Sequence, residues 1–240
     1  MSKNFEELAY HKTALGELIL RRRRVLSLGG IEVYEIKLGE AFLMSSLFHV
    51  VEVALAHLGL AELEEGPWDV VVGGLGLGYT ARAALEHREV ASLLVIDALK
   101  EVIDWHQCGL VPLGVELTSD PRLQMLHADF FQLSQSAEGF DPKQPKRKFH
   151  ALLLDIDHSP RHLLHPRNAA FYRPDGLRLL VAHLHAGGVF ALWSDDPPDE
   201  DFLSVLDTAF ATVRAHIVTF PNPLLDAECA STVYVACKAS

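Results

Sequence analysis

Short apolar runs alternate with helically spaced apolar residues along most of the chain. Patterns typical of buried strands occur at 68–72, 92–96, 123–127, 149–154 and 188–193. Helical spacing occurs at 79–87, 99–108 and 199–213, and two more strand patterns follow at 216–220 and 232–237. Alternating strands and helices predict right-handed βαβ units and a parallel sheet. We therefore predict an α/β protein with a Rossmann-like, seven-stranded, mostly parallel sheet that ends in an antiparallel pair.

The N-terminal region has a different pattern. Alternating residues at 15–22 and 31–38 flank Gly29-Gly30, which predicts a small β-hairpin. Residues 41–62 have apolar groups at helical spacing. We divide the chain into an N-terminal hairpin element, 1–40, and an α/β domain, 41–240. The basic run at 21–24 is expected at a solvated strand end rather than at an anion site.

Composition narrows the possible classes of protein. The chain has 240 residues, 49% of them hydrophobic, and a net charge of −11, which is a poor match to a general nucleic-acid binder. Its three cysteines form no CxxC pair, so reduced thiols are expected rather than a disulfide framework. No apolar stretch matches a signal peptide or a bilayer span. These features predict a cytoplasmic protein with no nucleic-acid or membrane partner. A polar segment, 134–148, is expected to be a surface insertion.

A glycine-rich turn is the strongest single motif. The strand pattern at 68–72 runs into Gly73, Gly74, Gly76 and Gly78, and a helical pattern follows. Glycines let the backbone approach a ligand closely, and the helix N-terminus adds a positive dipole end. This order of elements favours a nucleotide or nucleoside site over a plain turn.

Two acidic residues follow the next two strand patterns. Asp97 comes about 20 residues after the turn, where a carboxylate accepts hydrogen bonds from ribose hydroxyls. The alternative for Asp97 is a helix N-cap. Asp129 follows the strand pattern at 123–127 and is expected to accept the exocyclic amine of adenine, with a capping or turn role as the alternative.

The fourth strand pattern is followed by Asp155, Asp157 and His158. Ligands bind outside the carboxyl ends of parallel strands, so these are the predicted catalytic residues. In an extended turn the carboxylates of Asp155 and Asp157 would lie on the same side, and their mutual repulsion would raise the pKa of one of them. A carboxylate there would accept a proton from an amine. The alternative is a hydrogen-bonded turn without catalysis. The histidines His158, His162 and His165 are irregularly spaced, so no metal site is predicted.

The order of these motifs resembles the spermidine synthase family of polyamine aminopropyltransferases, which share the class I methyltransferase sheet. The resemblance covers roughly residues 15–200. It places the family's glycine motif at 73–78, its ribose-binding acid at Asp97, its adenine-binding acid at Asp129, and the first Asp of its Asp-Ser-Ser-Asp-Pro loop at Asp155. In the family that loop deprotonates the attacking amine.

Three departures from the family pattern stand out. The glycine motif lacks the Asp that meets the amine of decarboxylated S-adenosylmethionine. His158 stands where the loop's second Asp is expected, and Gly39-Glu40-Ala41-Phe42-Leu43-Met44-Ser45-Ser46 replaces the family's Asp-Glu…Tyr-His-Glu segment. The nucleoside-binding half therefore matches the family better than the acceptor half.

The resemblance implies an enzyme that moves an alkyl group, aminopropyl or methyl, from S-adenosylmethionine or its decarboxylated form to a small amine acceptor, without a metal. It also implies a homodimer through the N-terminal hairpin. Three alternatives remain open: a methyltransferase with an unrelated acceptor, a non-catalytic nucleoside-binding module, and an NAD-dependent oxidoreductase. The acids after successive strands fit an adenosyl donor better than NAD.

Overall fold

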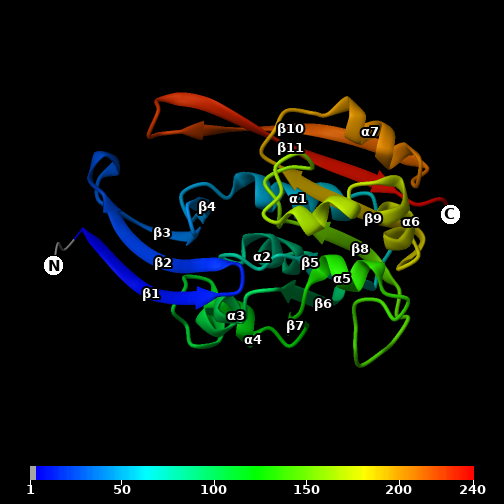
Figure 1. Cartoon of the computed structure of the whole chain (residues 1–240), viewed down its shortest axis with the longest axis horizontal. Helices are drawn as coiled ribbons and strands as arrows, with labels where there is room; N and C mark the ends of the chain where they lie inside the picture. The colour runs from blue at the N-terminus through cyan, green and yellow to red at the C-terminus, as the bar shows by residue number, and fades with distance from the viewer. Residues whose placement is uncertain (1–3) are drawn as a thin grey trace.

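The structure, a computed structural model, describes residues 4–240 and arranges the strands of that part of the chain in two sheets (Figure 1). The N-terminal sheet is antiparallel, with the order β1-β2-β3-β4. Its strands are β1 (Phe5–Thr13), β2 (Gly16–Val25), β3 (Ile31–Leu38) and β4 (Ala41–Ser45).

The larger sheet has seven strands in the order β10-β11-β9-β8-β5-β6-β7. The strands β5 to β9 run parallel, and β11 lies antiparallel between β9 and β10. This confirms the predicted Rossmann-like sheet with an antiparallel end. The strands are β5 (Trp68–Gly73), β6 (Val90–Asp97), β7 (Leu123–His127), β8 (Phe149–Leu154), β9 (Leu184–Ser194), β10 (Thr212–Asn222) and β11 (Ala227–Cys237).

Helices cover both faces of the larger sheet. One hydrophobic cluster contains residues of α1, α2, α3 and α4, and a second cluster on the other face contains residues of α5, α6 and α7. The first cluster also includes Leu18, Leu20 and Ile36 of the N-terminal sheet, so that sheet shares a core with the larger one. The helices are α1 (Val50–Leu60), α2 (Tyr79–Leu85), α3 (Lys100–Gln107), α4 (Gly114–Ser119), α5 (Phe130–Gln135), α6 (Pro174–Val181) and α7 (Glu200–Asp207).

The N-terminal element is larger than predicted. The expected hairpin is present as β2 and β3, but β1 and β4 flank it. The sequence of β1 is mostly polar because this edge strand is largely exposed, so it lacks the alternation of a half-buried strand. The strand β4 lies inside the predicted helix 41–62, and the helix itself begins at Val50. The division of the chain at residue 40 stays a prediction.

Two other expectations are corrected. The predicted helix 199–213 ends at Asp207, and β10 already begins at Thr212. The segment 134–148 is not a simple surface insertion, because Phe140 is fully buried and Asp141 is 4% exposed. The cause is Arg147, which donates hydrogen bonds to Asp69 and Asp141 and fastens the segment to the sheet. Along residues 4–240, no helix combines the length and apolarity that crossing a bilayer requires.

Candidate active site

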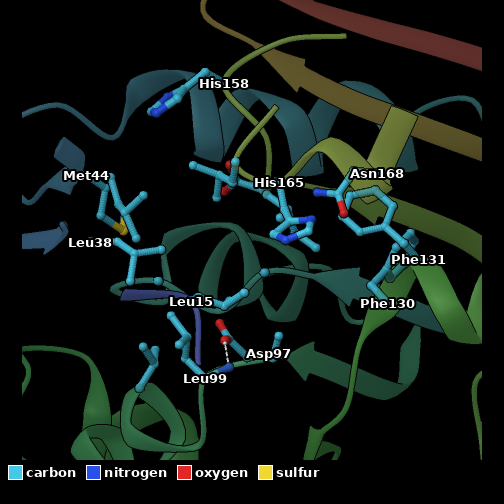
Figure 2. Close-up of a pocket in the computed structure, with 18 of the residues that line it drawn as sticks. Leu15, Leu38, Met44, Asp97, Leu99, Phe130, Phe131, His158, His165 and Asn168 are labelled. Carbon is cyan, nitrogen blue, oxygen red and sulfur yellow. Dashed lines mark hydrogen bonds between the residues drawn. The ribbon is translucent and has the colours of Figure 1, made fainter. Parts of the chain in front are cut away.

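A pocket opens at the carboxyl ends of the parallel strands, beside the N-terminal sheet (Figure 2). The larger sheet contributes the turn after β5 and the segments that follow β6, β7 and β8. The N-terminal sheet and α1 close the pocket from the other side. The residues that line it are Leu15, Ile36, Leu38, Leu43, Met44, Glu52, Gly74, Gly76, Asp97, Ala98, Leu99, Val102, Asp129, Phe130, Phe131, Asp155, Ile156, His158, Leu164, His165, Arg167, Asn168 and Trp193.

The predicted glycine turn lies at the pocket. Gly74 has a φ of +93°, and a Cβ placed on it would lie 2.0 Å from the carbonyl oxygen of Asp155. No side chain fits there, so the turn packs directly against the end of β8. Gly74 and Gly76 line the pocket. Gly73 and Gly78 are not among its lining residues; they admit neighbouring side chains of the core instead.

Asp97 ends β6 and lines the pocket beneath the glycine turn. Its carboxylate accepts a hydrogen bond from the backbone N–H of Leu75, at 2.9 Å. It also accepts one from the backbone N–H of Leu99, at 2.8 Å, which Figure 2 shows as a dashed line. Burial raises the pKa of Asp97, and the hydrogen bonds from the turn oppose that rise. The N-cap residue of α3 is Leu99 and has no side-chain cap, so the alternative of Asp97 as the cap of this helix is wrong.

Asp129 caps the N-terminus of α5, which is the alternative role that the sequence also allows. Its side chain accepts from the backbone N–H of Phe131 and Gln132 at the start of α5. The other carboxylate oxygen lies 3.1 Å from a guanidinium nitrogen of Arg167. Because Asp129 also lines the pocket with Phe130, a cap and a ligand contact are both available to it.

Asp155 and Glu52 form an acidic pair in the pocket. Asp155 follows β8 and accepts a hydrogen bond from the Thr80 hydroxyl at 2.8 Å, while burial raises its pKa to about 6. Glu52 lies in the first turn of α1 and is 9% exposed. Burial, and next the charge of Asp155, raise the pKa of Glu52 to about 8. Two neighbouring carboxyl groups in one pocket can bind a cationic group and can accept or donate protons.

The expectation that Asp155 and Asp157 share one side of the loop is wrong. The carboxylate of Asp157 is fully buried and accepts hydrogen bonds from the Leu164 backbone N–H, the Asn168 amide and the Tyr172 hydroxyl. Asp157 is not among the residues that line the pocket. Its carboxylate instead anchors the loop that follows β8. Its neighbour His158 does line the pocket, as predicted (Figure 2).

Several lining residues were not found by reasoning from the sequence. Glu52 lies in the segment 41–62, whose apolar spacing predicts a helix but does not indicate that Glu52 lies beside Asp155. Met44 enters from β4, and Trp193 comes from β9. Arg167 and His165 belong to the loop that Asp157 anchors. A single acid among apolar residues is the only sequence signal that could have indicated Glu52.

No group of three or more His, Cys, Asp or Glu residues in the described part of the chain has an arrangement that could hold a metal ion. The three histidines after β8 have separate partners. His162 Nδ1 lies 3.2 Å from a carboxylate oxygen of Asp196, and His165 accepts from the Arg167 backbone N–H at 3.1 Å. His158 faces the pocket.

The chain matches no known protein-family model. It is 27% identical over 195 residues to polyamine aminopropyltransferase 2 of Pseudomonas aeruginosa. The match covers 74% of this chain and 48% of that protein, so the chain spans about half the length of this curated relative.

Solved structures of spermidine synthases share the fold. A spermidine synthase in complex with the transition state analogue AdoDATO superimposes with a TM-score of 0.74 at 16% identity, covering 97% of this chain and 74% of that one. Spermidine synthase from Thermotoga maritima gives a TM-score of 0.73 at 16% identity, covering 97% and 73%. The predicted resemblance to the spermidine synthase family of polyamine aminopropyltransferases, on a methyltransferase-type sheet, is confirmed by sequence and by fold.

Proposed function

We propose that this protein is a transferase that moves an aminopropyl group from decarboxylated S-adenosylmethionine to a small amine. The name of the Pseudomonas relative supports aminopropyl transfer. The observation that carries the proposal is the pair Glu52 and Asp155, which places two carboxylates in one pocket beside the glycine turn.

The nucleoside half of the donor fits the described residues. The Asp97 carboxylate retains lone pairs for the ribose hydroxyls after accepting from Leu75 and Leu99. Phe130 and Phe131 offer an apolar surface for adenine, and Asp129 offers an oxygen for its amine. These residues follow β6 and β7, at the sheet edge where ligands of this fold bind.

The acidic pair favours the decarboxylated donor. The aminopropyl chain of that donor ends in an ammonium, which would favour the ionised form of Glu52 and pair with it once Glu52 releases its proton. Glu52 would then take the place of the Asp missing from the glycine motif. S-Adenosylmethionine has an additional carboxylate on this chain. Beside Glu52 and Asp155 that carboxylate would meet like charges in a partly desolvated pocket, which weakens binding.

The acceptor enters as an ammonium and must lose a proton before it reacts. Asp155 takes that proton, and its raised pKa makes it a stronger base than an ordinary Asp. The neutral nitrogen attacks the aminopropyl carbon next to the sulfonium, forming a C–N bond. The C–S bond breaks and its electron pair stays on sulfur, which leaves the neutral thioether 5′-methylthioadenosine. Because this leaving group needs no proton, positioning provides most of the rate acceleration.

Calorimetric titration with decarboxylated S-adenosylmethionine, S-adenosylmethionine and NAD in parallel tests the donor. We expect the decarboxylated donor to bind at least ~10-fold more tightly than S-adenosylmethionine, a difference of about 1.4 kcal/mol. Glu52→Gln should narrow the ratio of the two affinities, because Gln cannot ionise and so neither pairs with the donor's ammonium nor repels the carboxylate of S-adenosylmethionine. Asp175→Asn, on the exposed surface of α6, is the matched control and should leave the ratio unchanged.

Tighter binding of S-adenosylmethionine would indicate a methyltransferase instead. Binding of NAD alone, or of none of the three, would overturn the proposal. Tight binding of the decarboxylated donor without release of methylthioadenosine in the presence of any amine would indicate a non-catalytic module.

A further inference from the structure

The Asp155 carboxylate is held by a hydroxyl that lies behind the pocket. Thr80 is the second residue of α2, is 3% exposed and is not among the residues that line the pocket. Its Oγ1 donates to Oδ2 of Asp155 at 2.8 Å. Within residues 4–240 no other hydrogen bond reaches this carboxylate, so Oδ1 is left to accept from an amine.

Backbone contacts fix both ends of this hydrogen bond. The helix α2 begins directly after Gly78, whose φ is +95°. The Asp155 backbone N–H donates to the Gly73 carbonyl at 2.8 Å, and the Asp155 carbonyl packs against Gly74. A threonine has few χ1 rotamers in a helix, whereas the last torsion of an aspartate is broad. The hydroxyl therefore fixes an orientation of the carboxylate that would otherwise vary.

Glu52, the other acid of the pair, has no comparable donor. In the described part of the chain, the hydrogen bond that favours its ionised form comes from its own backbone. A hydroxyl that donates to a carboxylate favours the charged form, and this bond is stronger than one between the same hydroxyl and a neutral acid. Because the charge of Asp155 disfavours that of Glu52, the acid that holds the hydroxyl ionises first.

Other titratable or charged groups surround the pair and come from several elements. The charge of Asp195, just after β9, adds to the effects that raise the pKa of Glu52. These neighbours stay the same when only Thr80 is changed, so their contributions cancel between variants at that position. Besides the pair itself, they are Tyr79 and Arg82 of α2, Asp97 after the glycine turn, His158 after β8 and Asp195.

We propose that Thr80 is a positioning residue whose hydroxyl makes Asp155, rather than Glu52, the acid of the pair that takes the acceptor's proton. This inference rests on the proposed aminopropyl transfer and deepens it. The hydroxyl holds Oδ2, and Oδ1 accepts the proton that the acceptor's ammonium releases. Glu52 ionises second, when the ammonium of the bound donor favours its charged form.

Titration of the side-chain carboxyls by NMR tests the proposal in the ligand-free full chain. Isotope-labelled aspartate and glutamate report on Asp155 and Glu52, and Asp155→Asn and Glu52→Gln identify the two signals. Thr80→Val keeps the shape of the side chain and removes the hydroxyl. We expect it to raise the titration midpoint of Asp155 by about one pH unit and to narrow the gap to that of Glu52.

Three further variants make this measurement specific. Thr80→Ser retains a hydroxyl and should keep both midpoints near those of the unaltered protein. Thr80→Ala is a second variant without the hydroxyl, should valine prevent folding. Thr208→Val is the control, because the exposed Thr208 hydroxyl donates to the Val205 carbonyl at the end of α7, and it should change neither midpoint.

The pH profile of the reaction gives a second readout. Release of methylthioadenosine is followed with decarboxylated S-adenosylmethionine and 1,4-diaminobutane. In Thr80→Val the acidic limb of the kcat/KM profile should move to higher pH by about one unit, so activity on that limb falls by about 10-fold, and Thr80→Ser should restore it. An equal loss at every pH, with the limb in place, would show a merely structural role and overturn the proposal.

The outcomes separate this proposal from the proposed function. An unchanged Asp155 midpoint in the variants without the hydroxyl, or an equal rise in Thr80→Ser, would overturn the role of Thr80 whatever the reaction. If the decarboxylated donor reacts with no amine, aminopropyl transfer fails, and the carboxyl titration still decides whether Thr80 selects Asp155 as the acid that ionises first.

Discussion

At the scale of single residues, the surroundings of each pocket carboxylate separate its role from the others. Asp97 and Asp129 accept backbone hydrogen bonds, which hold their carboxylates in fixed positions. Asp155 accepts a side-chain hydrogen bond from Thr80, and Glu52 is buried beside it. Burial raises the pKa of Asp155 to about 6 and that of Glu52 to about 8, and neither carboxylate accepts a hydrogen bond from the glycine turn, so this pair is suited to exchanging protons and binding amines.

The raised pKa of Glu52 has a consequence for stability. The pKa of Glu52 is about 8 in the folded protein, whereas an ordinary Glu, as in the unfolded chain, has a pKa of 4.5. Folding therefore favours the protonated form of Glu52. That contribution is fully present below pH 4.5 and is lost as the pH rises through 8. Relative to Glu52→Gln, the ligand-free protein should thus lose stability between pH 5 and pH 9. We expect the Tm of the variant to gain at least ~2 °C on the unaltered protein across this range.

Thermal melts of both proteins at several pH values measure this difference, and other titrating groups cancel between them. Glu116→Gln, at an exposed position in α4, is the matched control and should follow the unaltered protein at every pH. Parallel curves for Glu52→Gln and the unaltered protein would contradict the raised pKa.

At the scale of elements, the pocket depends on three strand ends that meet. The Gly74 N–H donates to the Ile96 carbonyl at 2.9 Å, and the Asp155 N–H donates to the Gly73 carbonyl at 2.8 Å. The ends of β5, β6 and β8 are thus fastened together around the glycine turn. This arrangement places Asp97 and Asp155 on the same pocket although 58 positions separate them in the sequence.

Replacing Gly74 tests this junction, with Gly30 as its matched control. Both glycines have positive φ, +93° and +79°, but only Gly74 lacks room for a Cβ. Gly30→Ala should cost about 1 kcal/mol of unfolding free energy through backbone strain alone. Gly74→Ala adds a clash with Asp155 and should cost about 3 kcal/mol or more, with loss of donor binding. Denaturant titration and calorimetry measure the two effects, and equal losses for the two variants would contradict direct packing of the turn on β8.

At the scale of the whole molecule, the two sheets share one core cluster. Leu18, Leu20 and Ile36 of the N-terminal sheet pack in the cluster that also contains α1, α2 and α3. The aromatic rings of Phe48 and Phe220 lie 6.1 Å apart, so the far end of β10 also reaches the segment after β4 (Figure 1). Since the pocket lies between the two sheets, ligand binding depends on this packing.

The shared core implies a single cooperative unfolding transition. Leu20 in the N-terminal sheet and Leu154 in β8 are both fully buried, but in different clusters. Leu20→Ala and Leu154→Ala should each cost about 2–5 kcal/mol and lower one common Tm. Calorimetry and circular dichroism follow the transition. An early, separate transition in Leu20→Ala alone would show that the N-terminal sheet unfolds independently, in line with the sequence-based division at residue 40.

The sequence by itself determined the α/β alternation, the glycine turn and the acids that follow successive strands. These features are local, because buried strands, helix spacing and turn glycines leave periodic or compositional marks. It therefore predicted the sheet, and it placed Asp97, Asp129, Asp155 and His158, all of which line the pocket. Their roles toward a ligand stay predictions.

Only the tertiary structure decided which polar groups face the pocket. Asp155 and Asp157 look equivalent along the chain, but Asn168 and Tyr172 draw Asp157 into a buried network. Glu52 is one acid in an apolar helix, and only the packing of α1 against the sheet brings it beside Asp155. The edge strand β1 is largely exposed and lacks the apolar–polar alternation by which a half-buried strand is recognised. The burial of a side chain and the charges beside it depend on contacts between segments that are distant in the sequence. A local sequence pattern does not encode those contacts.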